Sequence, residues 1–310
     1  MSVLRTLLVT SVCAALGLAA CSTDSSQTAT NDTATKQTVT VSHDKGETTL
    51  NGPIESVVAL EFSFVDALLT LDTVPVGIAD DDDESRITQL AGDQLNYTSV
   101  GTRSEPNQEI IASLQPDLII ADTDRHSDIY EQLSAIAPTI VLNSREGSYE
   151  DMKKNTVVIA ESLGDKKQGE QVVSEHEQRM EEIKATAATL DPRTVQLVTA
   201  REDSLRIATS DSFVGSVIEE IGIEVPVKSD KAYEDASLER IAEVNPDVLL
   251  VASDVKNPVT SSWEGNPVWD NMTANSTPNS RFDVDRNLYT RFRGLTTAEH
   301  IASDVVSKLQ

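Results

Sequence analysis

The sequence predicts an α/β protein with two lobes and a helical connection between them, and three observations support this fold class. After Val39, short apolar runs alternate with stretches of helical character, which is typical of a largely parallel sheet covered by helices. The chain has 310 residues, 39% of them hydrophobic, and single cores usually stop growing at roughly 250–300 residues. A twelve-residue pattern also occurs twice, 130 residues apart.

The N-terminal residues predict export from the cytoplasm. Residues 1–20 have the features of a signal peptide, with Arg5 near the start and an apolar run, Leu7–Leu18, that is shorter than the ~20 residues of a membrane span. The run leads into Ala19-Ala20-Cys21, and this junction resembles the lipobox of bacterial lipoproteins. The resemblance implies cleavage before Cys21 and a diacylglycerol on its thiol, whose two acyl chains anchor a protein stably. The alternative is an ordinary secreted protein with a chance cysteine at this position.

Residues 21–38 and 39–147 form the next two predicted parts of the chain. The first is rich in Ser, Thr, Asp and Asn and has no large apolar residue, so we expect a lipidated flexible tether. The second is predicted as the N-terminal α/β lobe, which begins with a hairpin over Val39–Leu50 that turns at Asp44-Lys45-Gly46. Its predicted strands are Val57–Leu60, Val74–Ile78, Leu118–Ala121 and Thr139–Leu142, and its predicted helices include Phe64–Leu71 and Ser127–Ala135.

The connector is predicted over residues 148–190 and the C-terminal α/β lobe over residues 191–310. Helix formers fill the stretch from Tyr149 to Leu190, with one break at Gly164. Strands resume in the last part of the chain, at Val195–Thr199, Leu205–Ala208, Val248–Val251 and Arg281–Val284.

An internal repeat supports the division into two lobes. The segment Glu109–Ile120 recurs as Glu239–Leu250, and in each copy a helix led by Glu stops before Pro, after which Asp starts a buried strand. Corners of this kind are common in α/β folds, so the similarity alone does not require duplication. Because the spacing is shared over all twelve positions, we predict that the two lobes have the same topology.

Composition excludes several classes of function. The formal net charge is −26, which excludes a nucleic-acid binder because affinity for phosphate backbones depends on clustered positive charge. Both cysteines, Cys13 and Cys21, precede the folded part, so it has no disulfide, zinc–cysteine site or thiol chemistry. Aromatic residues make up 4% of the chain, which favours a polar ligand site. No catalytic motif is present and the four histidines are scattered, so we expect no enzymatic activity and no catalytic residue.

The arginines are distributed differently from the lysines. Lysines lie mostly in the tether, the connector and the chain ends, whereas arginines lie at the ends of predicted strands and helices, where open α/β sheets bind ligands. Arg291 and Arg293 alternate within a strand-like stretch, Tyr289–Arg293, and are expected to share a face. The full set predicted at such ends is Arg86, Arg103, Arg125, Arg145, Arg201, Arg206, Arg286, Arg291 and Arg293. A ring of these arginines predicts a positive pocket for a carboxylate-rich anion.

Three longer strings carry a family resemblance. Ala59–Leu68, Val100–Arg103 and Ile120–His126, together with the signal sequence and the two Pro-Asp corners, resemble the class III substrate-binding lipoproteins of iron–siderophore ABC importers. Within that family they are similar to the ferric-citrate and staphyloferrin A receptors. The resemblance covers the whole mature chain. It implies two Rossmann-like lobes bridged by a rigid helix, with the ligand in the cleft between them.

The resemblance also implies which residues bind the ligand, an iron(III)–carboxylate siderophore such as ferric citrate or a staphyloferrin A-like compound. Arginines of the family pattern match Arg86, Arg103 and Arg125 in the first lobe and Arg286, Arg291 and Arg293 in the second. A family histidine falls at Ala208, where this chain departs from the pattern, and Arg206 is expected to substitute for it. His126 is a further candidate at the cleft rim or an ordinary helix-start residue, and Tyr233 is a weaker candidate. The iron is expected to be held by the siderophore, with no direct metal ligand from the protein.

The resemblance implies an ABC permease dimer with its ATPase as the partner, on the outer face of a Gram-positive cell membrane. Glu109 and Glu239 match the family's surface glutamates, which pair with permease arginines, although each could instead complement a helix dipole. The acidic run Asp80–Glu84 is expected to be a solvated surface loop.

Two alternative functions remain open at this point. One is a receptor for another siderophore class, such as ferric hydroxamates. The other is a receptor for bare metal ions, which needs converging His, Asp and Glu ligands.

Overall fold

The computed structural model describes residues 38–310, which belong to one compact unit. The predicted signal peptide, the lipidated Cys21 and the predicted tether up to residue 37 lie outside the described residues. Among the residues that are described, no helix is both long enough and apolar enough to cross a membrane.

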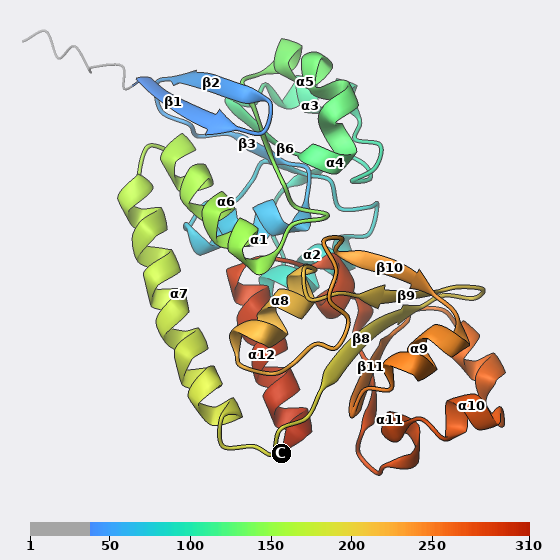
Figure 1. Ribbon diagram of the computed structural model, residues 1–310. Coiled ribbons are helices and arrows are strands. Elements are labelled where there is room, and N and C mark those ends of the chain that lie inside the picture. Colours follow the sequence, from blue (N-terminus) through green and yellow to red (C-terminus); the bar gives the residue numbers. More distant parts are fainter. Residues whose placement is uncertain (1–37) are drawn as a thin grey trace, which may run out of the picture. The chain divides into compact units, whose positions relative to one another are not determined.

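A hairpin opens the described chain, as predicted. Strand β1 (Thr38–His43) pairs antiparallel with β2 (Gly46–Asn51), and the turn lies at Asp44-Lys45 (Figure 1). Its buried side chains Val41 and Leu50 join the core of the first lobe. The hairpin is therefore a cover on that lobe and takes no part in the larger sheets.

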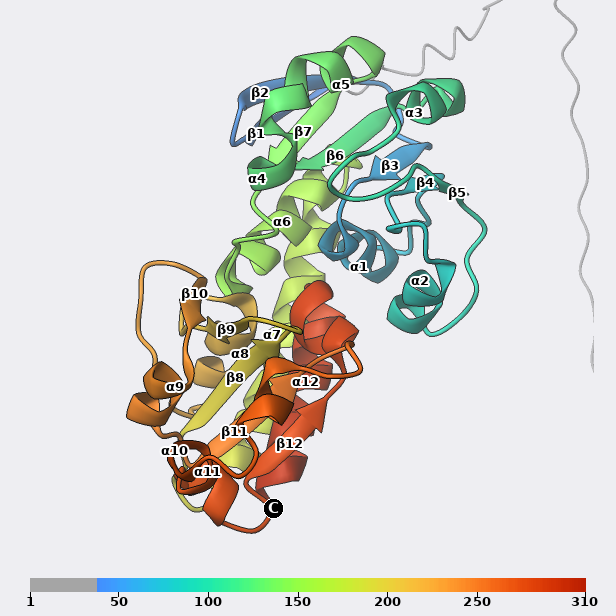
Figure 2. The ribbon, with the colours of Figure 1, turned by 90° about the vertical axis from the view of Figure 1, so that its right-hand side faces the viewer.

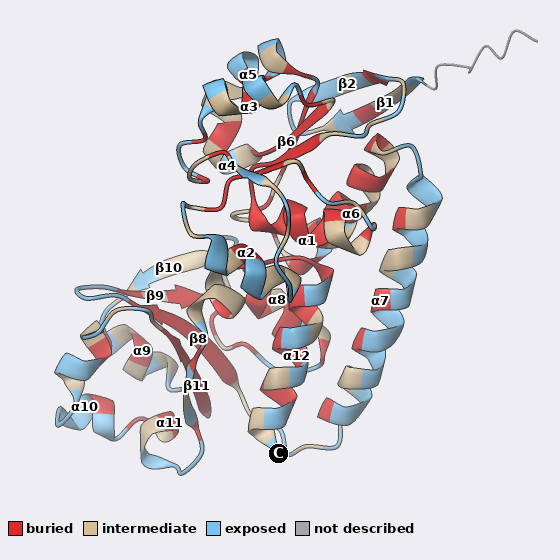
Figure 3. Cartoon of the chain, turned by 180° about the vertical axis from the view of Figure 1, so that it is seen from behind, coloured by how far each residue is buried: buried red, intermediate tan, exposed pale blue. Residues whose placement is uncertain are grey.

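The first lobe contains a five-stranded parallel sheet in the order β5-β4-β3-β6-β7. Its strands are β3 (Val57–Ala59), β4 (Gly77–Ile78), β5 (Thr98–Ser99), β6 (Leu118–Asp122) and β7 (Thr139–Leu142). Its helices are α1 (Phe62–Thr70), α2 (Glu84–Ala91), α3 (Gln108–Leu114), α4 (Thr123–His126), the 3₁₀ turn η1 (Ser127–Ile129) and α5 (Tyr130–Ile136). Successive residues of β6 alternate between two separate apolar clusters, one on each face of the sheet. This double burial explains why the strand is a continuous apolar run in the sequence (Figure 3).

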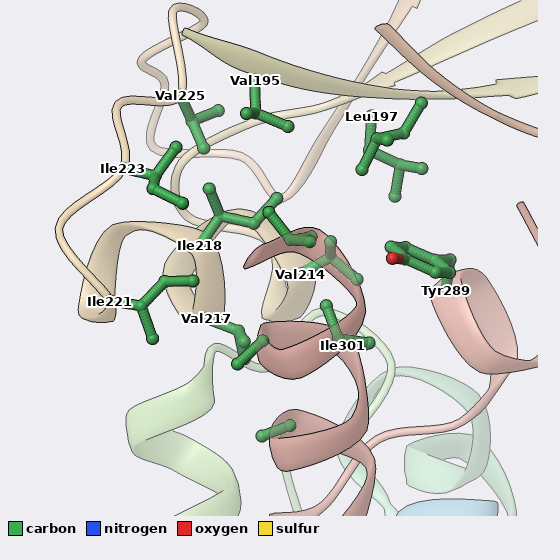
Figure 4. Packing of buried hydrophobic residues seen from close by; sticks show 14 of the residues in the cluster. Val195, Leu197, Val214, Val217, Ile218, Ile221, Ile223, Val225, Tyr289 and Ile301 are labelled. Atoms are coloured by element: carbon green, nitrogen blue, oxygen red, sulfur yellow. The ribbon is translucent and has the colours of Figure 1, made fainter. Parts of the chain in front are cut away.

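The second lobe repeats the strand order with one change of direction. Its sheet runs β10-β9-β8-β11-β12, and β9 is antiparallel to both of its neighbours (Figure 2). The strands are β8 (Val195–Ala200), β9 (Leu205–Ala208), β10 (Tyr233–Ala236), β11 (Val248–Ala252) and β12 (Arg281–Val284). The helices are α8 (Phe213–Glu220), α9 (Leu238–Val244), η2 (Val259–Trp263), α10 (Pro267–Asp270), α11 (Thr273–Ser276), η3 (Asn287–Arg291) and α12 (Leu295–Leu309). Side chains of β8, α8 and α12 form its largest core, exemplified by Leu197, Val214 and Ile301 (Figure 4).

The two copies of the repeat have matching local structures, so the predicted duplication is confirmed for the strand order and these corners, but not for the direction of β9. Helices α3 and α9 have seven residues each and end at Gln115 and Asn245, which adopt left-handed conformations with φ of 48° and 43°. The aspartates after the two prolines play the same part, since Asp117 and Asp247 each accept hydrogen bonds from the backbone and hydroxyl of a residue just before the first strand of the sheet.

The connector consists of two helices and not of one continuous helix. Helix α6 (Tyr149–Ser162) and helix α7 (Lys166–Ala187) lie side by side and are joined at Gly164, whose φ is +92° (Figure 1). Helix α6 packs on α1 of the first lobe, whereas α7 packs on α12 of the second. The start of α6 also reaches the second lobe, since Tyr149 and Met152 belong to the second-lobe core, so α6 joins both lobes.

A segment of the second lobe crosses into the first just before α12. Phe292 belongs to the first-lobe core, where its ring lies 5.6 Å from that of Phe62 in an edge-on arrangement. Asp66 of α1 accepts hydrogen bonds from the backbone N–H groups of Thr296 and Thr297 and from the Thr297 hydroxyl, and so caps α12 from the other lobe. Gly294 has φ of +123°, and a Cβ there would lie 2.4 Å from the Asp66 carboxyl carbon.

The predicted strand over Tyr289–Arg293 is wrong, because residues 287–291 form a π-helical turn. The Asp285 carboxylate accepts a hydrogen bond from the backbone of Leu288 and so starts the turn. The Tyr289 ring is buried in the second-lobe core beside Ile301, and its hydroxyl donates to Asp304 at 2.6 Å (Figure 4). A continuous strand would point that ring elsewhere, so core packing explains the difference.

Candidate functional site

A cavity of about 240 Å³ lies between the two lobes, and arginines dominate its lining. Within residues 38–310, the lining contains no carboxylate and only three residues other than arginine, Thr199, Tyr233 and Thr290. Its eight arginines are Arg103, Arg125, Arg145, Arg201, Arg206, Arg286, Arg291 and Arg293. Six of the eight predicted ligand residues are among them, and Arg86 and His126 are not.

On the first-lobe wall, Arg103 and Arg125 are held by buried acids. Arg103 lies beyond the end of β5 and donates to both oxygens of Asp81, at 3.1 Å and 3.2 Å from Nε. Its Nη1 donates to Glu61 at 3.3 Å, and its guanidinium stacks 4.1 Å above the Phe62 ring. Arg125 pairs through Nε with the other oxygen of Glu61, whose side chain is 1% exposed. The two arginines therefore share one buried counter-ion.

His126 is a supporting residue and not a lining residue, which corrects the prediction at the cleft rim. It is fully buried, its Nδ1 accepts from the Asp122 backbone N–H at 2.8 Å, and its Nε2 bonds the Arg103 carbonyl at 2.8 Å. Burial lowers its pKa, so the ring is neutral near pH 7. The ring fixes the backbone of Arg103 and the start of α4, which carries Arg125.

Only part of the acidic run is solvated, which corrects that prediction: Asp82 and Glu84 are exposed, whereas Asp80 and Asp81 turn inward. The Asp80 side chain is buried and accepts hydrogen bonds from the hydroxyls of Tyr97 and Ser99. Asp81 pairs with Arg103 and Arg86, and these hydrogen bonds lower its pKa although partial burial opposes them. Arg86 is thereby placed behind the acid that holds Arg103, outside the lining. Asp81 points inward because it pairs with Arg86 and Arg103, which both follow it in the sequence.

On the second-lobe wall, part of the lining stands on the sheet itself. Thr199 of β8 lies opposite Arg206 of β9, and Tyr233 of β10 is on the same face. The Arg206 guanidinium lies 5.2 Å above the Tyr233 ring. The Tyr233 hydroxyl accepts from Arg293 Nη2 at 3.1 Å, so one tyrosine orders two cations.

Arg293 is the most deeply placed cation of the second-lobe wall. It is 5% exposed, its Nη1 donates to the Arg291 carbonyl at 3.2 Å, and no carboxylate within residues 38–310 pairs with it. Its buried Nε also has no hydrogen-bond partner in the described part of the chain. A buried donor without a partner is costly, so this group has unused capacity for a ligand oxygen.

Arg201 follows β8, and the π-helical turn carries the other lining residues of this wall. Arg286 precedes the turn and Arg291 ends it, and the two share Asp254, with Arg291 Nη2 lying 2.6 Å from one oxygen and Arg286 Nη1 contacting the other. Burial lowers the pKa of Arg286, and the neighbouring Arg291 and Arg201 act in the same direction while Asp254 opposes them. The cavity is therefore a region of positive potential.

The charges around the cavity leave a positive surplus. Six carboxylates form ion pairs with the eight lining arginines, so two positive charges remain: the acids are Glu61, Asp81, Asp124, Glu146, Asp235 and Asp254. Guanidinium groups bind carboxylates through two parallel hydrogen bonds and stay charged at any physiological pH. The cavity is suited to an anion with several carboxylates. No three His, Cys, Asp or Glu side chains within residues 38–310 are arranged to hold a metal ion.

Glu109 and Glu239 lie far from this chemistry but at equivalent places in the two lobes. Both are exposed and both occupy the first turn of their helix, α3 or α9. A hydrogen bond from Ser237 lowers the pKa of Glu239. Each lobe thus presents one carboxylate to solvent at the same position of the repeat.

Sequence reasoning did not single out Glu61, Asp81, Asp124 or Asp254 as partners of the site arginines. Glu61 sits in a run of apolar residues at the start of α1, and that unusual position was the available signal. Asp124 and Asp254 each follow a buried strand, in the same place as the arginines that were noticed.

Comparisons with known proteins agree with this fold. The family model for periplasmic binding proteins matches residues 49–279. The Fe(3+)-citrate-binding protein YfmC of Bacillus subtilis is 39% identical over 297 residues, which cover 96% of this chain and 94% of that protein. The Fe(3+) dicitrate-binding periplasmic protein FecB of Escherichia coli is 37% identical over 271 residues, covering 86% and 89%. The structure of Staphylococcus aureus SirA with staphyloferrin B has a TM-score of 0.75 at 24% identity, covering 87% and 98%, which shows a shared fold.

Proposed function

We propose a function on the premise that this chain belongs to the periplasmic binding protein family: it captures an iron(III)–carboxylate complex of the ferric citrate type for an ABC importer. The family comprises substrate-binding proteins of transport systems. The observation that carries the proposal is the cavity with eight arginines and no lining carboxylate, inside a protein of net charge −26. The relatives named for ferric citrate support the same ligand class.

The chemistry of such a complex fits the cavity. Citrate surrounds iron(III) with carboxylates and leaves anionic two-oxygen groups at the periphery, which guanidinium binds in a bidentate manner. The direct contacts are assigned to Arg103, Arg125, Arg206, Arg286, Arg291 and Arg293. Arg86 and His126 act through Asp81 and Arg103. The metal stays in the citrate shell, so the protein selects charge and carboxylate geometry.

The position in the cell follows from the same proposal. We place the protein outside the cytoplasm, attached to the cell membrane through a lipid on Cys21. Glu109 and Glu239 are assigned to docking on a permease dimer, one glutamate from each lobe. Replacing both with arginine should abolish iron uptake by cells while ligand affinity in solution stays the same. A loss of affinity in that variant would refute the division of labour.

A calorimetric titration of residues 22–310 with a panel of ligands tests the binding function. The panel contains ferric citrate, ferric staphyloferrin A, iron-free citrate and a neutral ferric hydroxamate. We expect submicromolar affinity for a ferric carboxylate, and loss of binding in the Arg103→Ala, Arg291→Ala double variant. Preference for the neutral hydroxamate would overturn the proposal and favour the other siderophore class.

A matched control removes two arginines elsewhere. Arg179→Ala with Arg240→Ala deletes the same charge from two partly exposed positions on α7 and α9. Its affinity should equal that of the unmodified chain. An equal loss in both double variants would mean that net charge, and not the cavity, controls binding.

A further inference from the structure

Two aspartates outside the cavity lining hold three of its arginines, and the internal repeat relates them. Asp124 pairs with Arg145, whose Nε also lies 3.7 Å from Glu146, and Asp254 pairs with Arg286 and Arg291. The offset of 130 residues between the copies of the repeat takes Asp124 onto Asp254. Each aspartate follows the fourth strand of its sheet and reaches an arginine in the segment after the fifth strand. The duplicated fold therefore builds the same contact twice.

These aspartates differ from Glu61 in their exposure to water. The side chains of Asp124 and Asp254 are 41% and 42% exposed, whereas that of Glu61 is 1% exposed. Exposed ion pairs contribute little because water and salt screen them, but separating a buried pair leaves charges without solvent. A ligand carboxylate can therefore take the place of Asp124 or Asp254 as an arginine partner at a small cost in free energy, whereas it cannot take the place of Glu61.

The ligand and the aspartates need the same donors. Arg291 Nη2 donates to Asp254 at 2.6 Å, and Arg286 Nη1 contacts the other oxygen of the same carboxylate. Arg145 Nη1 donates to Asp124. A carboxylate that enters the cavity binds guanidinium through these same N–H edges. The incoming anion meets arginines that are already engaged.

We propose that Asp124 and Asp254 are exchangeable counter-ions, which neutralise Arg145, Arg286 and Arg291 in the free protein and yield them to the carboxylates of the ligand. This inference rests on the proposed function, since it requires a polycarboxylate ligand. Because the two aspartates compete with the ligand for these arginines, they lower the affinity for the ligand. Glu61 has the opposite role, because it holds Arg103 and Arg125 in place whether or not the ligand is bound.

Asparagine substitutions test the exchange directly. Asp124→Asn and Asp254→Asn keep the side-chain shape and one oxygen but remove the charge that competes with the ligand. Titration of residues 22–310 with ferric citrate should show affinity increased roughly twofold to fivefold by each substitution. The effects should multiply in the double variant, because the two aspartates hold different arginines. A fall in affinity would show that they position the arginines for binding, and would overturn the proposal.

Asp283→Asn is the matched control, since Asp283 is exposed on β12 and its loss changes the net charge equally. It should change the affinity by less than about twofold, because salt screens exposed charges. An equal gain in the control would mean that only net charge matters. If the unmodified chain does not bind ferric citrate, the proposed function fails; if it binds and both Asn variants bind equally well, this inference alone fails.

A crystal structure with ferric citrate gives an independent readout. The Asp254 carboxylate should lie beyond the ion-pair distance of about 4 Å from both Arg286 and Arg291. A complex in which both pairs persist beside the bound ligand would contradict the exchange.

Discussion

The two walls of the cavity come from sheets with the same strand order, yet they hold their arginines in different ways. In the first lobe all strands are parallel, and Arg103 and Arg125 come from segments beyond strand ends and pair with Glu61, which is buried. In the second lobe β9 is antiparallel, and Arg206 lies within this strand, so its side chain projects from the face of the sheet. Near the π-helical turn, Arg291 pairs with the exposed Asp254, and Arg293 donates a hydrogen bond to Tyr233.

This difference shows that a shared strand order does not give the two walls the same kind of ion pair. Ion pairs that are buried keep their geometry because breaking them leaves unsolvated charges. Ion pairs that are exposed are readily exchanged. We therefore regard the Glu61 pairs of the first-lobe wall as fixed, and the pairs made by Asp124 and Asp254 as responsive to the charge of the ligand.

The largest expected contrast is between Arg103→Ala and Arg291→Ala. The first takes from buried Glu61 and from Asp81 one of the two arginine partners that each has, and should reduce the free energy of unfolding by about 3 kcal/mol. The second removes a contact to an exposed acid and should cost at most ~1 kcal/mol. Both should weaken ferric citrate binding. Urea denaturation followed by circular dichroism measures the stabilities, and equal losses would break the comparison of the walls.

The joint between the lobes should show a pH dependence of its own. Burial raises the pKa of Asp66 to about 6, against hydrogen bonds from Thr297 and Thr296 that act in the other direction. The native state then binds more protons than the unfolded state between about pH 4 and 6, so this group makes the free energy of unfolding fall as pH rises through that window. The total fall due to Asp66 is about 3 kcal/mol.

Asp66→Asn removes this dependence and keeps a hydrogen-bond acceptor. The free energies of unfolding of the two proteins, measured from pH 4 to 7 and subtracted, should isolate the Asp66 contribution. The subtraction cancels Asp81, Asp254 and Glu299, whose lowered pKa values act in the opposite direction. A difference that does not change with pH would show that Asp66 is ionised throughout the range.

A moderate effect is expected for Glu61→Gln. The amide keeps the shape but removes the charge shared by Arg103 and Arg125, so we expect a loss of about 2 kcal/mol, typical of hydrogen bonds to charged groups. Asp254→Asn should change the stability by less than ~1 kcal/mol. Thermal unfolding of the two variants without ligand measures the two stability losses and so compares the ion pairs of the two walls.

The smallest effect is expected for Tyr233→Phe. The ring remains beneath Arg206, but Arg293 loses its hydroxyl partner. We expect ferric citrate affinity to fall by roughly tenfold, since a hydrogen bond from a charged guanidinium is worth about 1.5 kcal/mol. Unchanged affinity by calorimetry would mean that the ligand, and not Tyr233, orients Arg293 in the complex.

Local patterns predicted the parts of the fold that depend on continuous burial. The strands β3, β6, β7 and β11 are largely apolar because both of their faces are buried. The edge strand β10 is Tyr-Glu-Asp-Ala and lacks that pattern, so it was not predicted. The turn at 287–291 was misassigned because its alternating charges resemble a strand, whereas a buried tyrosine and an aspartate cap determine its shape.

The arginines of the site were predictable and their partners were not. Arg103 and Arg125 follow apolar strands, and the carboxyl ends of parallel strands meet at one edge of the sheet. Glu61 and Asp254 are distant in sequence from the arginines they bind, so only the folded chain shows the pairing. His126 was overrated for a related reason, since a histidine beside a site arginine satisfies the backbone as readily as a ligand.

The crossing of Phe292 and the cap from Asp66 also determine how the receptor can move. The segment that carries Arg291 and Arg293 packs on the first lobe through Phe292. Separation of the lobes would therefore remove the Phe292 ring from the first-lobe core and break the hydrogen bonds by which Asp66 caps α12. Loading then depends on side-chain rearrangements, which take nanoseconds, and not on slower hinge bending. Small-angle scattering curves of the empty and loaded protein should superimpose.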